Sequence, residues 1–145
     1  MTLQATLPAW RDTRLAAALA AAAPVWWLLA PHVGAARMAG GWPLLAGVAL
    51  YPVLEELCFR GLLQGWLLQR LGGATHAGIS AANLITSLAF AAAHLQAQPL
   101  AWALATLLPS LVFGWVRERY GRVLPAIALH VYYNAGLMLC ALWLR

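Results

Sequence analysis

Five long apolar stretches, separated by short turns, constrain this chain more than any other feature. Of its 145 residues, 63% are hydrophobic and only 9% are charged, and the mean hydropathy is +0.74. Soluble domains carry roughly 25% charged residues, and a helix of about 20 apolar residues is long enough to cross a bilayer. The sequence therefore predicts an all-α, polytopic membrane protein with about five transmembrane helices.

The limits of these helices follow from the charged and helix-breaking residues. The second stretch would form a helix of about 43 Å, so we expect it to be tilted or broken near Pro52. Turns are predicted at Gly72-Gly73 and over Arg117–Arg122, and the Gly61-x-x-x-Gly65 spacing predicts close helix packing. A cleaved signal peptide stays an alternative for the first stretch, because Arg11 and Arg14 precede it. The five predicted spans are Leu15–Ala36, Trp42–Arg70, Ile79–His94, Leu100–Val116 and Val123–Leu144.

The arginines predict the orientation of the chain in the membrane. Cytoplasmic loops carry an excess of basic residues. With the N-terminus in the cytoplasm, most arginines lie on the inner side and only Arg37 and Arg145 lie outside. Because the arginines are scattered singly at segment ends, we expect no nucleic-acid partner. The inner arginines would be Arg11, Arg14, Arg70, Arg117, Arg119 and Arg122.

Ionisable side chains interrupt three of the apolar stretches. At the bilayer centre such a side chain costs roughly 2.5 to 3.5 kcal/mol, so it is expected to face the interior of a helical bundle. The helices should therefore enclose a polar intramembrane cavity. The residues concerned form the patterns Glu55-Glu56-x-x-x-Arg60, Phe90-x-x-x-His94 and His130-x-x-x-Asn134.

Helical geometry places the side chains of the two neighbouring glutamates on different faces of their helix. Glu56 and Arg60 are four residues apart with the acid first, the order in which an ion pair on one helix face forms best. Glu55 projects about 100° away, so its partner must be another helix, a water molecule or a proton. At 1.5 Å per residue, Glu55 and His94 lie about 22 Å from the inner boundary. His130 lies only about 10 Å from it, unless its helix is tilted or starts elsewhere.

Several hydrolytic mechanisms can be weighed from the residue types. Paired aspartates are excluded because the only aspartate, Asp12, precedes the first span. The His-Glu-x-x-His pattern of zinc proteases is absent. A serine paired with a histidine stays open, since Ser87 lies two turns before His94, and Ser80 and Ser110 are also available. None of these serines has the glycine context of a nucleophile elbow.

An activated water is the remaining mechanism. Glu55 with His94 could take its proton, while His130 and Asn134 donate hydrogen bonds to a carbonyl oxygen that gains charge. The same side chains could instead line a proton or ion path, or belong to a non-catalytic scaffold. No inverted repeat is visible, which argues against a transporter.

Metal binding and disulfide formation are not indicated. Two glutamates and two histidines suffice for a zinc ion, but their spacing is not typical of a zinc site. We therefore expect no metal and no other cofactor. Cys58 and Cys140 both lie inside apolar segments, which does not suggest a disulfide framework.

The three patterns resemble those of a known family, the CPBP or Abi group of intramembrane proteases, to which the Rce1-type CAAX prenyl endopeptidases belong. Its motifs EExxxR, FxxxH and HxxxN match in order between Glu55 and Asn134. The resemblance implies an all-helical, glutamate-type intramembrane endopeptidase that forms no covalent intermediate. It implies Glu55 as the base, His94 as its helper, and His130 with Asn134 as the oxyanion pocket. The supporting residues would be Glu56, Arg60 and Phe90.

The resemblance also bears on substrate and location. The chain is similar to short bacterial members associated with C-terminal sorting signals of the JDVT-CTERM or MYXO-CTERM kind. This implies a membrane-anchored protein or peptide as substrate and the bacterial inner membrane as location. Removal of a bacteriocin leader or cleavage of another membrane protein is equally compatible with the motifs. We expect a single transmembrane domain over residues 1–145, with its catalytic core at about 42–144.

Overall fold

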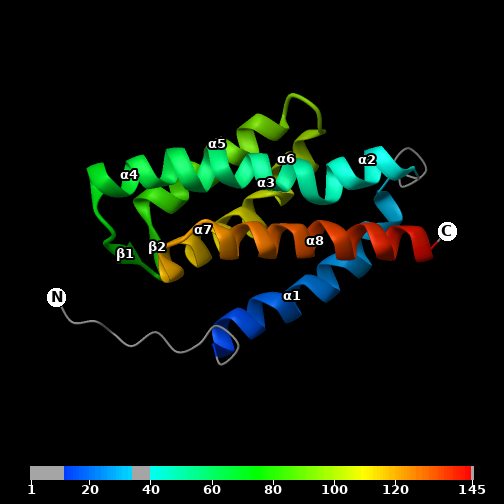
Figure 1. Cartoon of the computed structure of the whole chain (residues 1–145), viewed down its shortest axis with the longest axis horizontal. Coiled ribbons are helices and arrows are strands. Elements are labelled where there is room, and N and C mark those ends of the chain that lie inside the picture. Colours follow the sequence, from blue (N-terminus) through cyan, green and yellow to red (C-terminus); the bar gives the residue numbers. More distant parts are fainter. Residues whose placement is uncertain (1–11, 34–39, 145) are drawn as a thin grey trace.

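The computed structural model describes residues 12–33 and 40–144, which are almost entirely helical (Figure 1). The all-α membrane fold expected from the sequence is confirmed. The α-helices are α1 (Thr13–Leu29), α2 (Gly41–Leu45), α3 (Tyr51–Glu56), α4 (Gln64–Leu71), α5 (Ala81–His94), α6 (Leu100–Ala105), α7 (Leu107–Tyr120) and α8 (Leu124–Trp143). The other elements are the 3-10 turn η2 (Ala30–His32), the π-helical segments η4 (Ala46–Leu50) and η5 (Leu57–Leu63), and the strands β1 (Thr75–His76) and β2 (Ile79–Ser80).

Four helical segments are long and apolar enough to cross a membrane. They are Thr13–His32, Gly41–Leu71, Leu100–Tyr120 and Leu124–Trp143. The third predicted span, Ile79–His94, is shorter than expected, because Ile79 and Ser80 belong to a strand and α5 has only 14 residues. At 1.5 Å per residue α5 is about 21 Å long, less than the roughly 30 Å of a hydrocarbon core. The protein is a multi-pass membrane protein with four helices of spanning length and a fifth apolar helix, α5, that is shorter.

The second segment is one helix from Gly41 to Leu71, and the predicted break near Pro52 does not occur. Pro52, which has no N–H to donate, lies inside this continuous helix just after the π-helical segment η4. The helix instead widens into the π-helical segments η4 and η5 on either side of α3. Such π-helical turns are frequent at functional sites.

Two turns differ in detail from the sequence-based expectation. The hairpin between α4 and α5 turns at Ala77 and Gly78, whose φ angles of 53° and 82° are both left-handed. The segment from Arg117 to Arg122 is not a loop throughout, because α7 continues to Tyr120. It ends at Gly121, whose φ of 65° suits a glycine cap.

The helices pack around α7 and α8. α5 packs on α7, α8 packs on α7 and α3, and α1 lies on the outer side of α8 (Figure 1). A Cβ at Gly136 would lie 2.2 Å from the Trp26 ring, so only glycine admits this contact between α1 and α8. The Trp26 indole Nε1 donates to the Tyr133 carbonyl at 2.9 Å, which fixes the position of α1 along α8.

Candidate active site

Glu56 is the centre of a polar cluster inside the bundle. It is the last residue of α3 and its side chain is completely buried. The same carboxylate oxygen, Oε1, lies 3.1 Å from Arg60 Nη1 and 2.9 Å from His130 Nδ1. The ion pair expected from the four-residue spacing is therefore present, and a histidine of α8 joins it.

Arg60 links this cluster to α7 and α5. Its buried Nη2 donates to Ser110 Oγ at 2.6 Å and to the Ser110 carbonyl at 3.0 Å. The guanidinium also lies over the Phe90 ring, 4.6 Å from its centroid, in a cation–π contact. Three helical segments thus hold one charged side chain that has no access to solvent.

Glu55 differs from Glu56 in exposure. Its side chain is 32% exposed, and its Oε2 lies 3.8 Å from His130 Nε2. The partner that the sequence required from another helix is therefore His130. This position corrects the estimate from helix rise alone, which put His130 about 12 Å from the level of Glu55. The two neighbouring carboxylates contact the two different nitrogens of one imidazole.

The ring of His130 is fixed by a stacking contact with Phe113 and by a hydrogen bond to Glu56. It is 6% exposed, and it stacks on Phe113 at 4.6 Å between ring centroids with 24° between the planes. Because a carboxylate oxygen accepts, the Nδ1 that contacts Glu56 carries a hydrogen. Nε2 is therefore the nitrogen that faces Glu55 and any substrate beside it.

His94 lies at the C-terminal end of α5, and its side chain is partly exposed. Its Nδ1 lies 2.9 Å from the Phe90 carbonyl oxygen, an acceptor, so Nδ1 carries the hydrogen. Nε2 is then left with a free lone pair in the neutral ring. The imidazole also packs on the Phe90 ring, with 4.5 Å between ring centroids.

Asn134, one turn after His130, reaches a different part of the molecule. Its Nδ2 donates to the carbonyl of Gly47 at 3.0 Å. Gly47 belongs to the π-helical segment η4, so Asn134 ties α8 to the long helix just before Glu55. The amide has two N–H groups, and one of them stays available for another acceptor.

The structure therefore brings together Glu55, Glu56, Arg60, Phe90 and His130, and His94 joins this group through its contacts with Phe90. Asn134 is anchored on η4. Two residues of α7 also contact the cluster: Ser110, which the sequence offered only as a possible nucleophile, and Phe113, which sequence reasoning missed. Ser110 had a signal, since it is a polar residue in an apolar span. Phe113, three positions later on the same face, had none.

The hydroxyls of the three candidate serines are hydrogen-bonded to groups other than histidine. Ser87 Oγ donates to Asn83 Oδ1 at 3.1 Å, and Ser80 Oγ donates to Glu118 at 2.6 Å. Ser110 Oγ accepts from Arg60. Within the part of the chain that the structure describes, no serine hydroxyl is hydrogen-bonded to a histidine, so the geometry does not favour a serine nucleophile. Over the same residues, no three His, Cys, Asp or Glu side chains are grouped as metal ligands.

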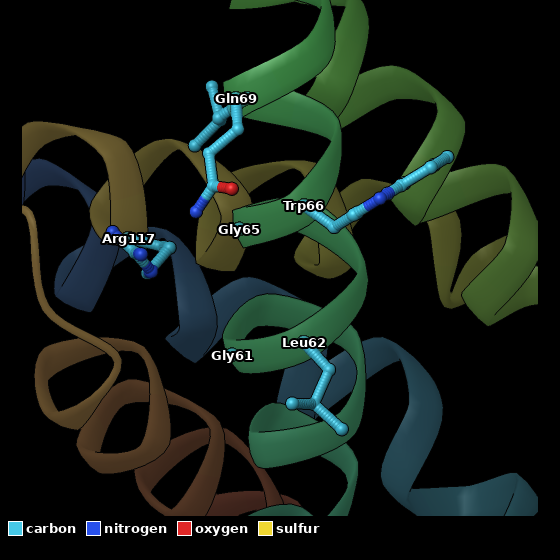
Figure 2. A pocket seen from close by; sticks show the side chains of 7 residues that line it. Gly61, Leu62, Gly65, Trp66, Gln69 and Arg117 are labelled. Atoms are coloured by element: carbon cyan, nitrogen blue, oxygen red, sulfur yellow. The ribbon is translucent and has the colours of Figure 1, made fainter.

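A shallow hollow of about 530 Å³ lies away from the glutamates, between the η5–α4 helix and α7. Figure 2 shows Arg117 facing the side of this helix that carries Gly61 and Gly65. The close helix packing predicted for these glycines is not observed, because a Cβ on either would meet nothing within 3.8 Å. The hollow holds neither imidazole nor carboxylate, so we place the candidate site at Glu55.

A partly exposed carboxylate 3.8 Å from an imidazole, inside a membrane-spanning helix bundle, is an arrangement that can support hydrolysis within the membrane. The family model of type II CAAX prenyl endopeptidase Rce1-like proteins matches residues 37–136, more than half of the chain. The chain belongs to this family, which is a family of proteases. No curated protein and no solved structure matches it.

Proposed function

We propose that the protein is a glutamate-type intramembrane endopeptidase, in which Glu55 activates a water molecule for attack on a peptide bond. The observation that carries this proposal is the contrast between two adjacent carboxylates. Glu56 is buried and bound to Arg60 and His130, whereas Glu55 is 32% exposed and 3.8 Å from His130 Nε2. A base needs a carboxylate that water can reach.

The hydrolysis can be written with residues of this chain alone. Glu55 takes a proton from water as the water oxygen bonds to the peptide carbonyl carbon. That proton passes to the amide nitrogen as the C–N bond breaks, which gives a carboxylic acid and an amine and restores the carboxylate. His94, whose Nε2 has a free lone pair, accepts a hydrogen bond from the same water and orients it.

The carbonyl oxygen gains negative charge during this attack and needs donors. We assign this role to His130 Nε2 and to the second N–H of Asn134. Because His130 Nδ1 already donates to Glu56, Nε2 donates only when both ring nitrogens are protonated. Glu56 and Arg60 support the site by fixing this ring, and Phe90 by covering the Arg60 guanidinium.

The proposed substrate is a membrane-anchored protein or peptide whose scissile bond lies near its membrane segment. Support comes from the position of Glu55 inside a spanning helix. Within this class we propose proteins with a C-terminal sorting tail, on the strength of the family resemblance. Co-expression with one such protein, one prenylated CAAX protein and one bacteriocin precursor separates the three substrate classes, since each product has its own mass.

We further propose that the protein lies in a bacterial inner membrane with its N-terminus in the cytoplasm. The described arginines support this orientation. Arg70 and Arg119 lie in the last turns of α4 and α7, and Arg122 follows α7. Basic residues at the ends of spans favour the cytoplasmic side. Reporter fusions that are active on one side only test the prediction, and a cytoplasmic signal from the loop at Arg122 is the expected result.

Replacement of Glu55 by Gln tests the proposed chemistry. We expect Glu55→Gln to insert normally and to cleave a co-expressed substrate at least about 100-fold more slowly, because general base catalysis contributes 10²–10⁴-fold. Glu118→Gln is the matched control, since Glu118 is bound to Gln64 and Ser80 and contacts no histidine. Undiminished cleavage by Glu55→Gln would refute the mechanism.

A further inference from the structure

Ser110 lies at the point where α7 meets the buried Arg60. It is completely buried and has no direct contact with Glu55, His94 or Asn134. Its contact with Arg60 is short, with 2.6 Å between Oγ and Nη2, as charge-assisted hydrogen bonds are. A buried hydroxyl that accepts from a charged group constrains where that group can lie.

The Arg60 guanidinium is bound by Ser110 of α7 as well as by Glu56. Among the residues that the structure describes, both hydrogen bonds of its side chain end on Ser110, one at Oγ and one at the carbonyl. Arg60 Nη1 faces Glu56 Oε1 at 3.1 Å, but without hydrogen-bond geometry. Ser110 therefore supplies the directional contacts, and Glu56 supplies the opposite charge.

These contacts continue to the imidazole. Glu56 Oε1, which faces Arg60, is the same atom that accepts from His130 Nδ1. A shift of the guanidinium therefore changes the acceptor that fixes the His130 ring. Phe113, one turn after Ser110 on α7, stacks on that ring, so α7 acts on His130 by two routes.

We infer that Ser110 is a positioning residue for peptide hydrolysis, acting through Arg60 and Glu56 to fix the orientation of the His130 ring and its hydrogen bond from Nδ1 to Glu56. This inference rests on the proposed function. It assigns to α7, which carries none of the three motifs, a part in the geometry of the site. Ser110 itself does not touch the substrate or the water.

Two measurements on Ser110→Ala test the inference. The first is the ¹⁵N spectrum of histidine-labelled protein in lipid nanodiscs, with the His130 signals identified by their absence in His130→Gln. We expect Ser110→Ala to move the His130 signals. The matched control is Ser87→Ala, which removes an equally buried hydroxyl that is bound to Asn83. It should leave them in place.

The second measurement is kinetic. We expect Ser110→Ala to lower kcat about tenfold with KM unchanged, as for the loss of a hydrogen bond to a charged group that acts on the chemical step. Ser87→Ala should keep the wild-type kcat. An unmoved His130 spectrum in Ser110→Ala overturns the inference even if cleavage is slower. If the wild type cleaves no substrate, the proposed function fails, and the spectrum still decides whether Ser110 positions His130.

Discussion

Two buried polar clusters in this bundle use similar side chains for different purposes. The Glu56 cluster consists of Glu55, Glu56, Arg60, Ser110 and His130. The Glu118 cluster consists of Gln64, Ser80, Asn83, Ser87 and Glu118. Both connect the long helix to α7, and apart from the partly exposed Glu55 and Glu118 their side chains lie at 0 to 6% exposure.

The clusters differ in charge and in access. Glu118 Oε1 accepts from two neutral donors, Gln64 Nε2 at 2.7 Å and Ser80 Oγ at 2.6 Å, and it is hydrogen-bonded to no imidazole. Glu56 shares one oxygen between a guanidinium and an imidazole, and that imidazole faces a second, exposed carboxylate. The Glu118 cluster is therefore suited to joining helices. The Glu56 cluster fixes the imidazole of His130 beside Glu55, the proposed base.

Replacement of Arg60 by Ala should have the largest effect on stability. It leaves the Glu56 carboxylate buried without its cation, and breaking a buried pair in this way costs about 3–5 kcal/mol. We expect this loss in the free energy of unfolding, measured by denaturant titration in micelles with tryptophan fluorescence. Arg70→Ala is the control, because Arg70 is exposed and lies over the Trp66 ring. Equal stability of the two variants would contradict the assigned role of Arg60.

Replacement of Gly114 by Ala should have a smaller effect and probes the Glu118 cluster. A Cβ at Gly114 would lie 2.0 Å from Asn83 Oδ1, so the Asn83 side chain must leave its hydrogen bonds or α5 and α7 must separate. Overpacking of this kind costs about 1–3 kcal/mol. In Gly65→Ala the nearest atom is Arg117 Nη2 at 3.9 Å, and we expect no loss of stability. If both variants unfold at the same denaturant concentration, the contact between α5 and α7 is looser than described.

The smallest effect is expected at Asp12, before α1. Hydrogen bonds from Arg119 and Tyr120 lower the pKa of Asp12 from 3.8 to about 2. Because the folded-state pKa is the lower one, this ion pair stabilises the fold above about pH 4 and ceases to do so as the pH falls to about 2. The difference in Tm between wild type and Asp12→Asn should shrink over this range. A constant difference would show that ionisation of Asp12 is not involved.

Much of the fold follows from the sequence, because length and hydropathy determine where helices can span. The Glu56–Arg60 pair also follows, since helical spacing puts both on one face. The π-helical segments do not, because widening of a helix depends on its neighbours. The start of α5 was predicted two residues too early, because the apolar Ile79 and the small Ser80 are compatible with a helix. The left-handed turn at Ala77 and Gly78 instead places both residues in the second strand of a hairpin.

The candidate site was predicted in composition and only partly in geometry. The motifs indicate Glu55, His94 and His130, but no local pattern says which imidazole lies nearest Glu55. The distance of 3.8 Å to His130 comes from the packing of α8 on α3. The contribution of Ser110 depends on its contact with Arg60, which lies 50 residues earlier in the chain. Spacing within one helix cannot predict such a contact.

The most direct test of the account is the cleavage rate of purified Glu55→Gln in lipid vesicles, with thermal unfolding measured on the same sample. The account predicts a rate at least about 100-fold below wild type, with an unfolding temperature close to that of wild type. A Glu55→Gln protein that folds and cleaves at the wild-type rate would contradict the claim that Glu55 activates the water.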